Sequence, residues 1–228
     1  MGKLKSKLLS CFSDQASTTA DDSPAPPQTA QPSQPQPGPE PQAFRRVPEG
    51  CGGTYRFDQS TTPFIGVDGC RSCLGVYFAI DHDRCFAAHI WPWVEPTKNK
   101  PGGLRISDPT GFAKMRSEIV RRLDEESERS DWPPKSQLMR DSLVMVCKQQ
   151  APEASSVAEW DTTVGLCAAL GVNDWLGHPA DRSVKARLQG GFVVRHPGRI
   201  EEYCELFADP DRWRAEGEAD DGRWRFGV

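Results

Sequence analysis

Short apolar runs rich in β-forming residues dominate the chain from residue 64 to residue 91. We expect three strands there, bounded by turn-forming residues: 64–67, 74–80 and 85–91. The turn at 81–84 is short enough for a hairpin, so the second and third strands should pair antiparallel. In an extended strand alternate side chains share a face, which places Cys85, Ala87 and His89 together.

The pattern then changes to the period of a helix. Asp108 and Pro109 form a favourable helix start, an N-cap residue followed by proline at the first helical position. The apolar residues that follow have the spacing of one helix face: Phe112, Met115, Ile119, Val120 and Leu123. We expect this helix to end before Trp132.

Further elements are predicted in the second half of the chain. Ser156 and Glu159 have the spacing of a capping box and predict a helix that ends at Gly171. Short strands are expected at 143–147 and 192–194. Strands and helices intermix without strict alternation. The pattern therefore predicts the α+β class, a layered sandwich in which helices cover a largely antiparallel sheet.

Composition restricts the classes of function. The chain has 228 residues and a net charge of −4, which argues against a nucleic-acid-binding protein, since these usually carry a basic excess. No run approaches the roughly 20 apolar residues that span a bilayer. The eight cysteines do not follow a secretory signal sequence, so we expect reduced thiols rather than a disulfide framework.

The N-terminal segment, residues 1–13, has the features of a lipid anchor. Gly2 and Ser6 fit the pattern for N-myristoylation, and Cys11 lies among apolar residues as a palmitoylation site. Three lysines of this segment add attraction to an anionic membrane surface. One acyl chain binds a membrane only weakly, so stable attachment requires a second signal, such as the acylated cysteine or the lysines. These features predict attachment to the cytoplasmic face of a membrane.

A linker separates this anchor from the folded part. Residues 14–43 are rich in proline, glutamine and small polar residues and cannot form a core, so we expect a disordered spacer. Residues 44–228 should then form a single globular domain. A protein substrate within reach of such a tether would itself be associated with the membrane.

Cys73 and His89 are the residues that we expect to carry chemistry. Cys73 stands where a glycine-containing turn enters a strand, and the hairpin returns His89 to the same end. An imidazole that accepts the thiol proton produces a thiolate, which attacks carbonyl carbon. Backbone N–H groups of the turn at 68–73 would stabilise the oxyanion. No cofactor is needed for this reaction.

The motif S-C-L-G-V at 72–76 followed by A-A-H-I at 87–90 resembles the chemoreceptor glutamine deamidase family called CheD. That family shares a fold and a Cys–His pair with the cytotoxic necrotizing factor toxins. The resemblance covers mainly residues 64–91, and it implies that Cys73 is the nucleophile and His89 the base. The implied reaction is hydrolysis of glutamine side-chain amides in a protein substrate.

One position departs from the family pattern. The family has a threonine six residues before the nucleophile, and Val67 occupies that place here. Asp68, the next residue, or a backbone carbonyl is then expected to orient His89.

Three other interpretations use the same residues. Cys70, Cys73, Cys85 and His89 have the spacing C-x2-C-x11-C-x3-H, which approaches that of a structural zinc site. Zinc would occupy the thiol that catalysis needs, so these two hypotheses exclude each other. Cys70 and Cys73 would alternatively form a redox pair. Finally, the domain would be an inactive interaction scaffold.

Overall fold

The computed structural model describes residues 38–71, 73–90, 109–148, 172–176, 185–187 and 189–218. All of these residues except Gly38 belong to one compact unit that extends from Pro39 to Val228. The lipidation positions Gly2 and Cys11 and the helix predicted from Ser156 to Gly171 lie outside the described residues. None of the described helices has the length and apolar character needed to cross a bilayer.

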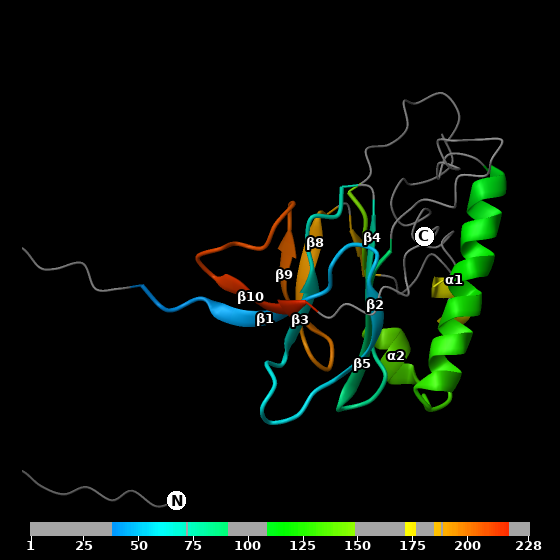
Figure 1. Cartoon of the computed structure of the whole chain (residues 1–228), viewed down its shortest axis with the longest axis horizontal. Coiled ribbons are helices and arrows are strands. Elements are labelled where there is room, and N and C mark those ends of the chain that lie inside the picture. The colour runs from blue at the N-terminus through cyan, green and yellow to red at the C-terminus, as the bar shows by residue number, and fades with distance from the viewer. Residues whose placement is uncertain are drawn as a thin grey trace, which may run out of the picture. The chain divides into compact units, whose positions relative to one another are not determined.

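The first sheet has the strand order β10-β1-β3-β8-β9. Its strands are β1 (Gln42–Arg46), β3 (Phe64–Val67), β8 (Gly191–Arg195), β9 (Arg199–Cys204) and β10 (Trp213–Glu218). Strand β1 pairs in parallel with both β3 and β10, whereas β8 pairs antiparallel with β3 and β9. The sheet thus joins the N-terminal part of the unit to its C-terminal part (Figure 1).

The second sheet has the order β2-β5-β4-β6-β7. Its strands are β2 (Gly52–Arg56), β4 (Leu74–Ala79), β5 (Arg84–Ile90), β6 (Val144–Val146) and β7 (Lys185–Arg187). The hairpin of β4 and β5 is central, and β2 and β6 pair antiparallel with its two sides. The pairing of β6 with β7 is parallel, whereas the other pairings among the described strands of this sheet are antiparallel.

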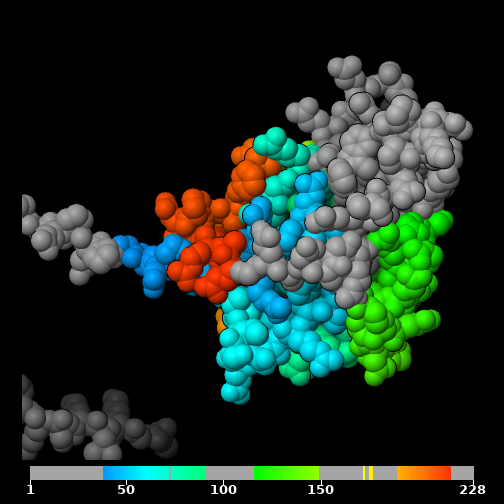
Figure 2. All heavy atoms as spheres, viewed as in Figure 1, coloured from blue at the N-terminus to red at the C-terminus, as the bar shows by residue number. Residues whose placement is uncertain are grey.

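The described helices are α1 (Pro109–Arg129), α2 (Gln137–Asp141) and α4 (Val172–Leu176). Figure 2 shows α1, in green, along one side of the described region. The helix is anchored near its C-terminus, where buried Glu126 accepts hydrogen bonds from the backbone N–H and the hydroxyl of Thr54 in β2. Trp132, just beyond the helix, donates its indole N–H to the same hydroxyl.

Alternation along the hairpin produces two apolar clusters. One face contributes Val76, Phe78 and Phe86 to a cluster with the helices, which supply Ile119, Leu123, Met139 and Trp175. The opposite face contributes Tyr77 and Ala87 to a cluster with the first sheet, which supplies Ile65, Val67, Phe192 and Val194. Because β4 packs on both faces, all six of its residues are buried.

The structure confirms the mixed α/β character and the predominance of antiparallel pairing, although the strands form two sheets. The predicted strand at 64–67 is confirmed, and the hairpin strands and the long helix lie where expected within one or two residues. Strand β1 begins at Gln42, inside the segment assigned to the linker. Five strands were not predicted, because their short or polar sequences lack a strong strand pattern: β1, β2, β7, β9 and β10.

Candidate active site

His89 lies on the face of β5 that points toward the first sheet. Its partner in the hairpin register is Gly75 of β4. A side chain at Gly75 would collide with the side chains of Val67 and Val146, so glycine is required where the two sheets approach. His89 is therefore buried, with 3% of its surface exposed, beside a point of close contact between sheets.

The turn between β3 and β4 brings two thiols to this end of the hairpin. Gly69 has a φ of +75°, a conformation that glycine adopts without steric cost. The turn is held by distant segments, because Gly69 N–H donates to Leu206 O at 2.5 Å and Cys70 N–H donates to Gly190 O at 2.7 Å. These two amides, predicted to stabilise an oxyanion, are thus already hydrogen-bonded.

The thiol that the structure brings to His89 is that of Cys70. The distance from Cys70 Sγ to His89 Nε2 is 3.3 Å. Burial raises the pKa of Cys70 well above its usual range, with nearby Cys73 and Cys147 adding to the effect. Burial also lowers the pKa of His89. Both effects favour a neutral thiol beside a neutral imidazole.

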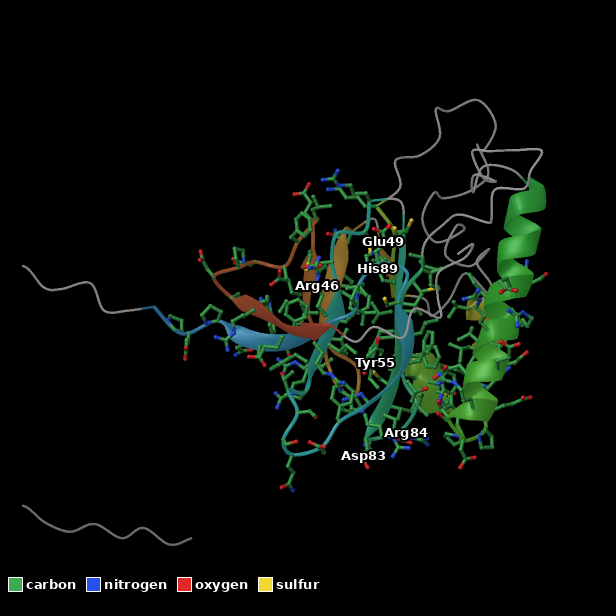
Figure 3. The ribbon with its side chains drawn as sticks, viewed as in Figure 1. Arg46, Glu49, Tyr55, Asp83, Arg84 and His89 are labelled. Carbon is green, nitrogen blue, oxygen red and sulfur yellow. The ribbon has the colours of Figure 1, made fainter. Side chains whose placement is uncertain are left out.

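The predicted nucleophile, Cys73, contacts a carboxylate. Its thiol donates to Glu49 Oε1, with 2.9 Å between sulfur and oxygen. Glu49 is exposed and lies in the turn between β1 and β2. Figure 3 shows Glu49 and His89 near each other at one end of β5, and the Glu49 carboxylate is the strongest of the influences that oppose the lowered pKa of His89.

Asp68, which together with a backbone carbonyl was one of the two groups expected to orient His89, pairs with Arg46. Its carboxylate accepts a hydrogen bond from Arg46 Nε at 2.7 Å and forms an ion pair with that guanidinium. Its charge favours protonation of His89 only weakly, and Arg46 opposes this effect. The pairing with Arg46 could not be predicted from the local motif, because Arg46 lies on β1.

Within the described part of the chain, Nδ1 of His89 is the one buried side-chain nitrogen or oxygen without a hydrogen bond. The backbone of Val47 lies near enough to favour the protonated ring, yet it forms no hydrogen bond of normal geometry. Buried polar groups are nearly always hydrogen-bonded, so an unsatisfied one marks a functional candidate.

The four residues of the zinc hypothesis do not gather at one point. Cys85 and His89 lie on the same strand, four residues and roughly 13 Å apart at the usual rise of an extended chain. Cys85 is instead buried in the cluster between the sheets. Among the described residues, no three metal-binding side chains lie close enough to hold an ion.

Glu49 is the residue that the sequence analysis missed. The letters P-E-G-C at 48–51 indicate a turn, but no local signal shows that this turn lies against the end of β5.

No protein-family model matches the chain, and no curated protein matches its sequence.

Proposed function

We propose that the chain is a cysteine-dependent amidohydrolase that hydrolyses side-chain carboxamides, with glutamine in a protein as substrate. The observation that carries the proposal is the contact of the Cys70 thiol with His89, next to a second thiol, that of Cys73, which contacts the exposed carboxylate of Glu49. The incomplete hydrogen bonding of His89 adds support. The resemblance to the CheD and cytotoxic necrotizing factor proteins, a local one, supplies the reaction class.

Cys73 is the better nucleophile of the two thiols. Cys70 is wholly buried, and its raised pKa disfavours the thiolate. Cys73 contacts an exposed residue, so a substrate that displaces Glu49 reaches its sulfur. Cys73 also stands two residues before Gly75, the register partner of His89, so an extended chain places both side chains on one face at diagonal positions.

The reaction starts from neutral groups. His89 accepts the proton of the Cys73 thiol, and the thiolate attacks the carbonyl carbon of the carboxamide. The resulting imidazolium donates that proton to the nitrogen, and ammonia leaves as the thioester forms. His89 then takes a proton from water, and the hydroxide hydrolyses the thioester to a carboxylic acid and the regenerated thiol.

The scaffold of this site is inferred to be a layered sandwich covered by helices. The cluster shared by the two sheets and the cluster shared by the second sheet and the helices support this arrangement. The site then lies at the edge of the inter-sheet cluster, where the turns before β2 and β4 meet.

The proposal includes a membrane tether. The N-terminal pattern around Gly2 and Cys11 favours dual acylation, and the linker allows the domain to reach substrates at the cytoplasmic face of the membrane. Intact mass spectrometry of the native protein tests this part. An unmodified Gly2 together with a free Cys11 would refute the anchor and leave the hydrolase proposal intact.

Thiol labelling tests the nucleophile. A haloacetamide should alkylate Cys73 faster than the other buried thiols, and His89→Ala should slow this labelling by roughly 10- to 30-fold at neutral pH, as the thiolate fraction falls. Peptide mapping identifies the labelled cysteine. His82→Ala is the matched control, since its side chain is exposed in the hairpin turn. Preferential labelling of Cys70, or equal labelling in both histidine variants, would refute the assignment.

A further inference from the structure

The turn that carries Glu49 is fixed against His89 by backbone hydrogen bonds. Gly50 N–H donates to His89 O at 2.8 Å, and His89 N–H donates to Cys51 O at 2.9 Å. Cys51 N–H also closes the turn on Pro48 O at 3.1 Å, and Gly50 has a φ of +75°. The backbone on both sides of Glu49 is therefore held in one place relative to the imidazole.

The carboxylate of Glu49 lies in contact with the sulfur on which the proposed reaction takes place. The distance from Glu49 Oε1 to Cys73 Sγ is 2.9 Å, and Glu49 is exposed. A carboxylate that accepts a hydrogen bond from a thiol keeps the proton on sulfur. Such a contact does not by itself activate Cys73, so it calls for another explanation.

The chemistry of a primary carboxamide supplies that explanation. Its carbonyl carbon must approach Cys73 Sγ, which places the attached –NH2 group next to the atoms that contact sulfur. An –NH2 group donates hydrogen bonds and a carboxylate only accepts them. The substrate nitrogen is thus a suitable replacement for the thiol as the donor to Glu49.

We propose that Glu49 is the specificity-determining residue of the site, and that it accepts a hydrogen bond from the –NH2 group of a substrate carboxamide in exchange for the Cys73 thiol. This inference rests on the proposed amidohydrolase function. The exchange frees the thiol to give its proton to His89 as the substrate binds. Esters and N,N-disubstituted amides lack the donor and leave Glu49 without its replacement partner.

The same carboxylate distinguishes substrate from product. Hydrolysis converts the carboxamide to a carboxylate, which has no N–H and carries a negative charge. Asp68 adds a second negative charge in this region, partly balanced by Arg46, while the raised pKa of Cys70 keeps that thiol neutral. The product is therefore repelled at the position where the substrate is held.

Alkylation of Cys73 by matched reagents tests this role on the full chain without a known substrate. Iodoacetamide has a primary carboxamide, 2-iodo-N,N-dimethylacetamide is equally neutral without N–H, and iodoacetate carries the product's charge. The corrected preference is the ratio of the Cys73 labelling rate with iodoacetamide to that with 2-iodo-N,N-dimethylacetamide, divided by the same ratio for free glutathione. This division removes the difference in intrinsic reactivity between the two reagents. We expect this corrected preference to be about tenfold in the unmodified chain.

Glu49→Ala should reduce the corrected preference to near unity and should accelerate labelling by iodoacetate. Glu125→Ala is the control of equal charge change, since Glu125 lies on the exposed side of α1 beside Arg121. That variant should retain the tenfold preference. A preference that is unchanged in Glu49→Ala, or that is absent from the unmodified chain, would overturn the role of Glu49.

The two proposals fail in different ways. If His89→Ala leaves all three rates unchanged, the activated nucleophile is refuted, whatever preference Glu49 imposes. If His89→Ala slows all three reagents while Glu49→Ala leaves their ratios unchanged, the nucleophile stands and the specificity residue is refuted. A Cys73 that none of the reagents labels in the folded chain would refute both.

Discussion

Two buried histidines lie near opposite ends of the β4–β5 hairpin, and their surroundings differ. His196 has both ring nitrogens hydrogen-bonded, with Tyr77 Oη at 3.0 Å from Nδ1 and His82 O at 2.9 Å from Nε2. Phe57 stacks on its ring, with 4.3 Å between centroids. His89 has a thiol at Nε2 and no hydrogen bond at Nδ1.

The difference separates a structural histidine from a candidate catalytic one. Burial lowers the pKa of both side chains, so a lowered pKa does not distinguish them. The hydrogen bonds of the two rings do distinguish them. A ring with both nitrogens hydrogen-bonded is fixed in one tautomer and has no free position for a proton. His89 lacks one of these hydrogen bonds, at Nδ1, and its Nε2 contacts the Cys70 thiol.

Replacement of each histidine should separate catalysis from stability. We expect His89→Ala to reduce hydrolysis of glutamine-containing peptides by about 100-fold, the usual contribution of a general base. His196→Ala should change the rate per folded molecule less than about threefold while lowering stability. Ammonia release, corrected for the folded fraction, provides the measurement. Equal losses of rate in both variants would remove the distinction.

Tyr77→Phe should lower the free energy of unfolding by about 1–3 kcal/mol, because His196 Nδ1 then loses its buried donor. Urea unfolding followed by tryptophan fluorescence gives the value. Labelling of Cys73 in the folded variant should not change, since Tyr77 contacts His196 rather than His89. A parallel loss of labelling would show that the two ends of the hairpin are coupled.

Acidification should destabilise the fold through both histidines. Their folded-state pKa values lie below the ordinary value of 6.5, so the unfolded chain binds more protons as the pH falls. This contribution is complete above pH 6.5 and is lost below it, at up to about 1.4 kcal/mol per pH unit for each histidine.

Urea unfolding between pH 7 and pH 5.5 measures this loss, and His196→Gln should remove about half of the slope. This range lies above the titration of ordinary carboxyl groups. A free energy of unfolding that does not change over this range would contradict two buried neutral imidazoles.

The smallest effect is expected for Asp68→Asn. Because Asp68 pairs with Arg46 rather than with His89, the variant should change labelling of Cys73 by less than about threefold. Its cost in stability should be about 1 kcal/mol or less, since Arg46 is partly exposed. A large loss of labelling would indicate that Asp68 orients His89.

Local patterns predicted the hairpin and the first helix well. The β4–β5 strands adjoin in sequence and alternate in side-chain direction, so the face that carries His89 follows from the sequence alone. Ile119 and Leu123 of α1 are buried in the cluster with the second sheet, as their helical spacing predicted. Cys73 and His89 were placed at the same end of this hairpin for the same reason.

The contacts of the site depended on segments far apart in sequence. The turn that holds Cys70 is fixed by Gly190 and Leu206, more than a hundred residues away, and Glu49 comes from a turn between strands that no pattern predicted. Local periodicity carries no information about which distant backbone will bond to a given amide. The choice of thiol at His89 could therefore not be made from the motif.

The sequence by itself determined the class of fold, the hairpin and the presence of thiols near one imidazole, because each depends on periodicity or on neighbours along the chain. Only the tertiary structure decided that Cys70 contacts His89 and that Glu49 contacts Cys73. It also decided that Arg46 forms an ion pair with Asp68. These pairings require the two sheets to pack together, and sheet packing is set by the summed burial of residues from the whole unit.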